Sequence, residues 1–136
     1  MAPPIVATAR QRLVLAMIDE ENAGEEVRIK VVLGWQDNAF EGKATGPRSE
    51  TARARLVAEA TLRAVERVVE GRIGFDLTAV DTTSLGGSQI ALASVQARDS
   101  FDSYVGSAKL READPAKATA RAVLAAINRC LESVIG

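Results

Sequence analysis

The sequence contains no histidine. This absence excludes Ser-His and Cys-His nucleophilic catalysis, imidazole acid–base chemistry and most zinc sites. The single cysteine, Cys130, cannot form an internal disulfide, so the fold must be stable without one, as is usual in the reducing cytosol. Because Cys130 falls within an apolar stripe of the last expected helix, we interpret it as a packing residue and not as a reactive thiol.

The chain also lacks an excess of charge of either sign and any long apolar run. Its 17 basic and 18 acidic residues leave a formal net charge of −1, which does not favour nucleic acid or an anionic membrane as a partner. No apolar run approaches the length of a membrane span, and the first residues lack the apolar core of a signal peptide. We therefore expect a soluble, cytoplasmic protein with no nucleic-acid partner, no membrane partner and no cofactor.

What the chain does have is an internal duplication. The segments 13–69 and 75–131 carry the same order of apolar runs, turns and helix, at an offset of about 62 to 64 residues. The match is clearest in ATLRAV at 60–65 against AVLAAI at 122–127, and in FEGKA at 40–44 against YVGSA at 104–108. Such a repeat indicates one architecture used twice.

Each half predicts three strands followed by a helix. Strands are expected at 13–18, 27–33 and 40–44, and again at 75–80, 89–97 and 104–108, with turns at 19–24 and 81–87 and hairpin loops at 36–38 and 99–103. Ser49 and the Asp114-Pro115 pair mark the helix starts. Apolar stripes then follow in each helix. They comprise Ala58, Thr61, Leu62, Val65 and Val69 in the first, and Ala120, Val123, Leu124, Ile127 and Leu131 in the second.

The fold class expected is α+β, a duplicated βββα unit with antiparallel sheets and two helices packed on one side. Residues 1–12 form an N-terminal arm, and residues 13–136 form a single domain. The alanine-rich strands, at Ala91, Ala93 and Ala97, allow close approach of either the helices or a second subunit, so we expect a homodimer. The charged side of the first helix is interpreted as a solvated face with a Glu59–Arg63 ion pair.

No strong catalytic or metal-binding pattern emerges. The Asp99–Asp102 segment is too short for a calcium loop and is interpreted as a hairpin tip, and the acidic residues from Asp19 to Glu26 are interpreted as a solvated turn. Lys43 and Asp81 are the only conceivable catalytic side chains apart from other carboxylates. Trp35 is either a partly buried residue at a strand end or a ligand-stacking platform.

The duplicated βββα pattern, with GKATGP at 42–47 and SLGGS at 84–88, resembles the C-terminal regulatory domain of 2-isopropylmalate synthase. In that family the domain binds leucine at a dimer interface, relatives that bind isoleucine regulate citramalate synthase, and the catalytic barrel is a separate domain. The resemblance implies a free-standing regulatory module with a partner enzyme elsewhere. Gln89-Ile90 replaces the Thr-Asp pair usual in the family.

The resemblance implies seven ligand-binding positions on glycine turns and strands. They are Gly42, Gly46, Gly86, Gly87, Ser88, Gly106 and Ser107. The function expected is a non-catalytic, dimeric domain that binds a small amino-acid-like ligand. The alternatives are an assembly module that has kept dimerisation without a ligand and, third, an enzyme. Because the halves differ most between Asp19 and Gly24 and between Ser84 and Ser88, we expect the site at these unequal turns.

Overall fold

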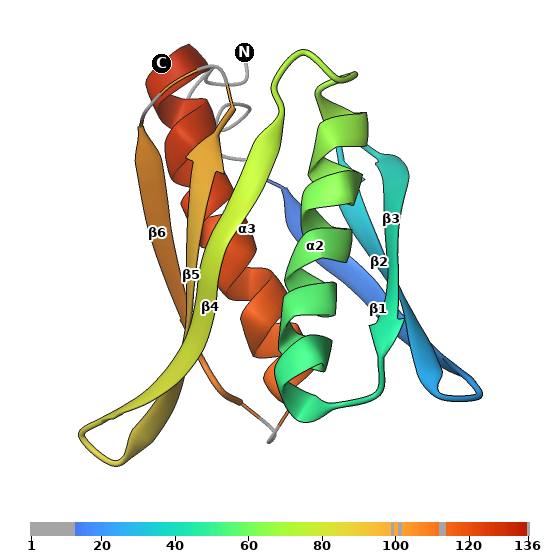
Figure 1. The fold of residues 1–136 in the computed structure, drawn as a ribbon. Coiled ribbons are helices and arrows are strands. Elements are labelled where there is room, and N and C mark those ends of the chain that lie inside the picture. Colours follow the sequence, from blue (N-terminus) through green and yellow to red (C-terminus); the bar gives the residue numbers. More distant parts are fainter. Residues whose placement is uncertain (1–12, 99, 101, 112–113, 136) are drawn as a thin grey trace.

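The computed structural model describes residues 13–98, 100, 102–111 and 114–135, with side chains described as far as Cys130. Two βββα units follow one another along the chain (Figure 1). This arrangement confirms the α+β class and the duplicated pattern expected from the sequence. The predicted arm at 1–12 lies outside the described residues.

The first unit forms sheet A, which is antiparallel in the order β1-β2-β3, and the helix α2. Its strands are β1 (Val14–Ala23), β2 (Glu26–Trp35) and β3 (Asn38–Pro47), and α2 covers Glu50–Val68. The turn predicted at 19–24 is wrong in extent, because β1 continues to Ala23 and only the Gly24 and Glu25 positions turn. Polar residues of a two-stranded ribbon that protrudes from the core show no apolar alternation, so the sequence pattern ends before the strand does.

The second unit repeats this plan in sheet B, in the order β4-β5-β6. Its elements are β4 (Phe75–Leu85), β5 (Ser88–Ala97), β6 (Ser103–Lys109) and the helix α3 (Pro115–Ile135). The turn predicted at 81–87 is likewise too long, because β4 reaches Leu85 and Gly86 and Gly87 alone make the turn at positive φ. Each first strand has a register shift at the same place, between Leu15 and Met17 and between Leu77 and Ala79.

Both helices begin where capping chemistry predicts. The Ser49 hydroxyl oxygen accepts a hydrogen bond from the Ala52 N–H at 3.2 Å, and the Asp114 carboxylate accepts one from the Lys117 N–H at 3.2 Å. The predicted stripes are confirmed as the buried sides of α2 and α3, except that Val69 is half-buried and follows α2 as its C-cap. The Leu131 side chain lies outside the described part of the chain.

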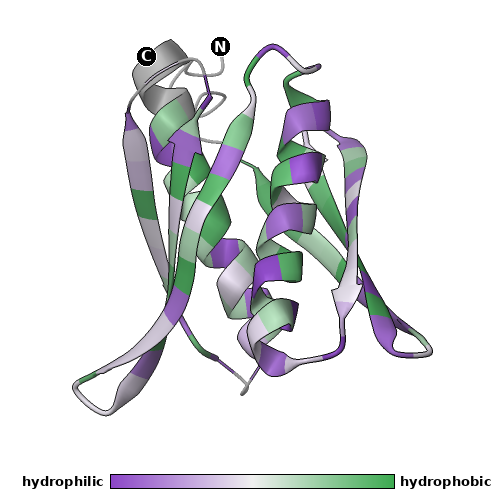
Figure 2. Cartoon of the chain, in the orientation of Figure 1, coloured by the Kyte–Doolittle hydropathy of each residue, from purple (hydrophilic) through white to green (hydrophobic). Residues whose placement is uncertain are grey.

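The helices lie between the two sheets, whose inner faces they cover (Figure 1). The helix α2 packs on β2 and β3 and also reaches β4, while α3 packs on β5 and β6 and reaches β1. Figure 2 shows hydrophobic residues along the central strands, hydrophilic residues near the end of the β1–β2 hairpin and mostly near-neutral residues at the end of the β4–β5 hairpin. Neither helix in the described residues is long and apolar enough to cross a membrane.

The alanine-rich strands serve the approach of the helices. Ala91, Ala93 and Ala97 are buried on the inner face of β5, the strand against which α3 packs. Of the two uses considered from the sequence, close packing of a helix is therefore the one that these side chains perform. The homodimer expected from them stays a prediction and needs another surface.

One glycine in each unit brings a strand against its helix. A methyl group at Gly42 of β3 would overlap the Ala60 carbonyl oxygen and the Ala64 amide nitrogen of α2. Gly106 of β6 meets the backbone of α3 in the same way. The strand and helix backbones therefore approach more closely than any residue with a Cβ permits.

A carboxylate joins the two units at the end of α2. Glu66 accepts hydrogen bonds from Arg63 at 2.6 Å and from the Phe75 N–H at 3.0 Å, and its second oxygen lies 3.7 Å from the Arg98 guanidinium. The sequence-based prediction paired Arg63 with Glu59, but the structure pairs it with Glu66, which is only 20% exposed. Part of the helix face expected to be solvated is thus used to fix the start of β4.

Candidate functional site

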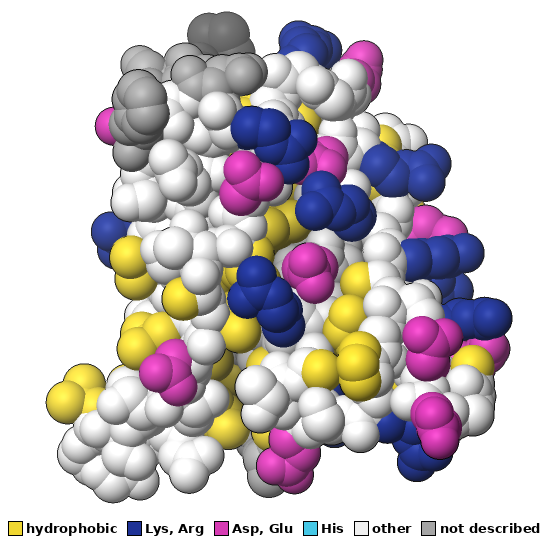
Figure 3. All heavy atoms as spheres, viewed as in Figure 1, with side chains coloured by type: hydrophobic (Ala, Val, Ile, Leu, Met, Phe, Trp, Pro, Cys, Tyr) yellow, Lys and Arg dark blue, Asp and Glu magenta, His cyan; other side chains and the backbone are white. Residues whose placement is uncertain are grey.

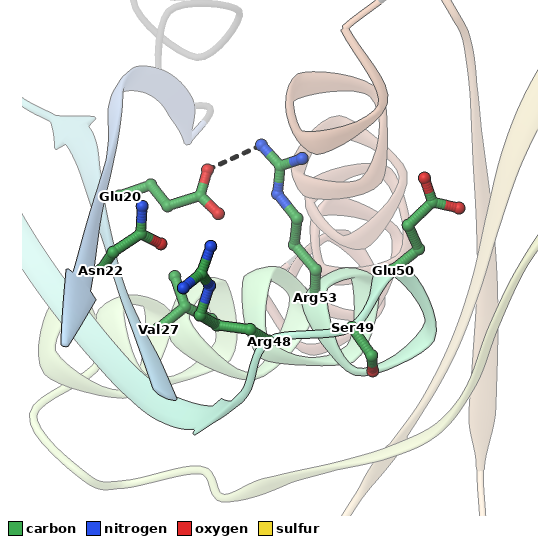
Figure 4. A pocket seen from close by; sticks show the side chains of 7 residues that line it. All are labelled: Glu20, Asn22, Val27, Arg48, Ser49, Glu50 and Arg53. Atoms are coloured by element: carbon green, nitrogen blue, oxygen red, sulfur yellow. Dashed lines mark hydrogen bonds and ion pairs between the residues drawn. The ribbon is translucent and has the colours of Figure 1, made fainter. Parts of the chain in front are cut away.

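An open depression of about 240 Å³ lies where the β1–β2 hairpin meets the start of α2 (Figure 4). We call it the hairpin pocket. Residues from both strands, from the segment that follows β3 and from the first turn of α2 line it. They are Glu20, Asn22, Val27, Arg48, Ser49, Glu50 and Arg53.

Strand register explains why polar side chains face this pocket. Glu20 pairs with Ile29 and Asn22 pairs with Val27, and both partners are buried on the inner face of sheet A. Directly paired residues of antiparallel strands point to the same side of the sheet. The inner face of β1 is therefore apolar near the core and polar beside the start of α2.

Four of the lining side chains approach one another across the pocket. Arg53 donates a hydrogen bond to Glu20 at 2.7 Å, and Arg48 donates one to the Gly24 carbonyl oxygen at 3.1 Å. Figure 4 shows the two guanidinium groups and the Glu20 and Asn22 side chains gathered on one side, while Glu50 points away. The Ser49 hydroxyl is engaged as the helix cap.

The charges of the hairpin pocket favour a ligand that carries both a negative and a positive group. Two guanidinium groups lie at the start of α2, where free backbone N–H groups add positive potential. Glu20 supplies the single converging carboxylate. Because the Arg53 and Glu20 side chains are 46% and 33% exposed, their ion pair is weakened by water and contributes below about 1 kcal/mol. A charged ligand can therefore exchange with it at little cost.

The seven predicted ligand positions are not brought together. Gly42 and Gly106 lie beneath α2 and α3, respectively. Gly86 and Gly87 form the tip of the β4–β5 hairpin, where Ser88 begins β5, and Ser107 is exposed on β6. Only Gly46 is close to the hairpin pocket, because it pairs with Val27 and lies against the Leu56 side chain.

Gly42 also borders a wider groove of about 600 Å³ between β3 and α2. Charged side chains of both signs line this groove, and some already pair with each other, as Lys43 does with Glu41 at 3.7 Å. Figure 3 shows basic and acidic side chains intermixed over this side of the molecule. No apolar residue contributes to the lining of the groove, whereas Val27 contributes to that of the hairpin pocket.

The residues considered for catalysis lie far apart in the topology. Lys43 is on β3 of sheet A, and Asp81 is on β4 of sheet B. Cys130 is buried, and burial raises the pKa of its thiol, an effect that a hydrogen bond with Tyr104 reduces. In the described ranges, no group of three or more His, Cys, Asp or Glu side chains is placed to hold a metal ion.

Trp35 ends β2 beside the two-residue turn at Gln36 and Asp37, as the strand-end interpretation predicts. It is half-buried and packs against the hydrophobic core. The sequence argument missed Asn22, Arg48 and Arg53 as possible ligand contacts. Its only available signal was the acidic segment around Glu20, which it assigned to a solvated turn. No family model matches the chain, and no curated protein is similar to it at a significant level.

Proposed function

We propose that this chain is a non-catalytic, dimeric regulatory domain that binds a small amino-acid-like ligand, and that the hairpin pocket is its binding site. The observation that supports this most is the convergence of Arg48, Arg53, Glu20 and Asn22 beside the apolar side chain of Val27. A small number of converging polar groups that can fix the orientation of a ligand is typical of sites for small molecules. The resemblance to the regulatory domain of 2-isopropylmalate synthase supports the same class of ligand.

The chemistry of an α-amino acid fits the charges of the pocket. Its carboxylate would accept hydrogen bonds from Arg48 and Arg53, each of which carries five N–H donors and gives only one in the hydrogen bonds described above. Its ammonium group would lie near Glu20 and the amide oxygen of Asn22. Val27, the one apolar side chain of the lining, is buried, so the charged and amide groups would carry most of the binding. The volume of about 240 Å³ suits a metabolite smaller than a drug-sized molecule.

Isothermal titration calorimetry against the twenty amino acids tests the proposal. We expect at least one to release or absorb heat with the wild-type chain. Arg53→Gln removes a charge-assisted hydrogen bond of about 1.5–3 kcal/mol, so the affinity should fall roughly 10- to 100-fold. Arg55→Gln is the matched control, because Arg55 is exposed two residues further along α2 and is not part of the pocket lining.

The second candidate function is an assembly module that has no ligand. The observation that favours it is the Glu20–Arg53 ion pair, which already satisfies two of the groups that a ligand would use. Under this alternative, none of the twenty amino acids would give heat or raise the melting temperature, although the chain would still self-associate. If the wild type, Arg53→Gln and Arg55→Gln bound an amino acid with equal affinity, the binding site would have to lie outside the hairpin pocket.

A further inference from the structure

The outer faces of the two sheets differ in charge although the sheets are duplicates. The face of sheet A that points away from the helices carries Arg28, Lys30 and Glu41 in its middle. A shallow depression of about 170 Å³ there is lined almost entirely by charged side chains. Charge dominates this part of the face, whereas the rows towards the other end of the strands expose Met17 (45%) and Val14 (58%), which pair with Val32 and Gly34.

We call the corresponding face of sheet B the neutral face. Its rows follow from the pairing of β4 with β5 and of β5 with β6. From the hairpin end upward the rows are Thr83-Ile90-Lys109, Asp81-Leu92-Ser107 and Ala79-Ser94-Val105. Asp81 and Lys109 are the only charged residues in these rows.

The duplication gives each residue of the neutral face a counterpart on sheet A. Ile90 and Leu92 correspond to Arg28 and Lys30 at an offset of 62 residues, and Val105 corresponds to Glu41 at an offset of 64. The same scaffold therefore accepts charge at these positions, but the second unit has apolar residues instead. Val105 is 57% exposed in the single chain. Ile90 and Leu92 are half-buried, so the apolar surface that replaces permitted charge is centred on these two residues and on the exposed Val105.

We infer that the neutral face binds the neutral face of a second copy of this chain, around a two-fold axis that runs along β5. In this arrangement β4 of one copy lies over β6 of the other, with the rows aligned. Ile90 and Leu92 meet their own equivalents on the axis, as an isologous interface requires. This inference gives a surface to the dimer proposed above, but it does not depend on the ligand.

Side-chain size and charge both suit this axis. Val105 of one copy would face Ala79 of the other, so a larger side chain meets a smaller one in the row where both are exposed. Asp81 would face Ser107 of the other copy, with Lys109 one row, or roughly 7 Å, along the strand. Two Asp81–Lys109 pairs would thus form across sheets that are about 10 Å apart, a gap that a lysine side chain largely spans.

The other two-fold axis in the sheet plane runs across the strands and is less favourable. It would place β4 over β4 of the second copy, with rows reversed about the centre. With Leu92 at the centre, Asp81 would face Asp81, and these like charges would repel each other. In the register centred on Leu92, the positions of the two charges therefore favour the axis along β5.

The size of the neutral face predicts a weak dimer. Extended by the adjoining Leu85-Ser88 and Asp76-Gln96-Ser103 rows, the second of which adds the charge of Asp76, the face follows the 10 residues of β5 over roughly 33 Å, and three strands cover roughly 14 Å in width. The contact would bury roughly 450 Å² per copy, or roughly 900 Å² in total, at the low end of specific interfaces. Association is expected at micromolar and not nanomolar concentrations.

Sedimentation equilibrium of the full chain between about 5 and 500 μM tests the inference. We expect a reversible monomer–dimer equilibrium for the wild type. Leu92→Lys imports the residue that sheet A carries at this position and places two lysines on the axis, so it should weaken association at least tenfold. Val32→Lys adds the same charge to the outer face of sheet A and should leave association unchanged, with circular dichroism confirming that both variants fold.

Charge reversal supplies a second, independent test. Asp81→Lys should weaken the dimer, and addition of Lys109→Asp in the same chain should restore it. A wild type that stays monomeric at 500 μM would overturn the inference, as would equal weakening by Val32→Lys and Leu92→Lys or a double variant no tighter than Asp81→Lys. If no amino acid gave heat in the calorimetry while the wild type still formed a dimer, only the ligand proposal would be refuted.

Discussion

Replacement of Gly42 by alanine separates a structural role of this glycine from a role in binding. The added methyl group would lie closer than 3.0 Å to three backbone atoms of α2, contributed by Ala60, Arg63 and Ala64. Backbone atoms cannot rotate away as a side chain can, so strand and helix must separate. Gly42 has no positive φ, and alanine fits its local backbone conformation, so the contact alone sets the cost.

The magnitude follows from two opposing terms. Overpacking of a tightly packed core costs typically 1–3 kcal/mol, and a clash with backbone on a fixed helix belongs at the upper end. Loss of chain entropy in the unfolded state returns about 0.4–1 kcal/mol for Gly→Ala. We therefore expect Gly42→Ala to lower the free energy of unfolding by at least about 2 kcal/mol, which corresponds to a melting temperature roughly 7 °C lower.

Gly46→Ala is the matched control on the same strand and the same face. Its methyl group would meet only the Leu56 side-chain carbons, at 3.0 and 3.2 Å, and leucine can adjust its rotamer. The expected change is within about 1 kcal/mol of zero. Urea unfolding, followed by the fluorescence of Trp35, the sole tryptophan, and by circular dichroism, measures both variants. Equal stabilities for the two variants would refute the reasoning, and lost ligand binding at unchanged stability would restore Gly42 to the binding site.

Two further predictions concern the junction of the units and the buried thiol. Glu66→Ala removes the hydrogen bonds from Arg63 and from the Phe75 N–H, so it should lower the free energy of unfolding by about 1–2 kcal/mol in the same urea titration. Glu59→Ala on the same helix is the control and should change this free energy by less than about 0.5 kcal/mol. Burial raises the pKa of the Cys130 thiol above its ordinary value of 9.0. The negative charge of Asp102 adds to this rise, whereas the hydrogen bond with Tyr104 reduces it. The folded chain should therefore react with a disulfide reagent at pH 8 far more slowly than the chain in urea. The free energy of unfolding should fall as the pH rises above about 9, because the thiol of the unfolded state loses its proton first. Equal thiol reactivity in the folded and unfolded chains would contradict the second prediction.

The sequence predicts the elements of this fold well but not their full length. Alternation and duplication located all six strands, because the core portions of β2 and β5 face a helix and must be apolar on one side. The outer parts of β1 and β4 leave the core, so both of their faces are largely polar and carry no periodic apolar signal. Backbone pairing holds these parts in strand conformation, and in β1 the ion pairs of Glu20 with Arg53 and of Glu21 with Arg28 add to it.

The hairpin pocket shows why the site was harder to predict than the fold. Glu20 and Arg53 are 33 residues apart and belong to different elements. Their contact depends on the inward direction of Glu20 in the β1 register and on the helix start at Glu50. Neither residue belongs to a motif, so no local pattern relates them. Glycine motifs were visible in the sequence, but Gly42 and Gly106 are required for close packing of a strand against a helix, not for binding a ligand.

Comparison of the two units within the chain separates architecture from function. Both units keep the glycine beneath the helix and the shift in the first strand, because each βββα unit needs them to close on its helix. The hairpin pocket belongs to the first unit alone, since the positions of Glu20 and Arg53 are occupied in the second by Thr82 and Pro115. The neutral face belongs to the second unit alone. Under the two proposals, the first unit would serve a ligand and the second a partner copy, so each chain would carry one ligand and each dimer two.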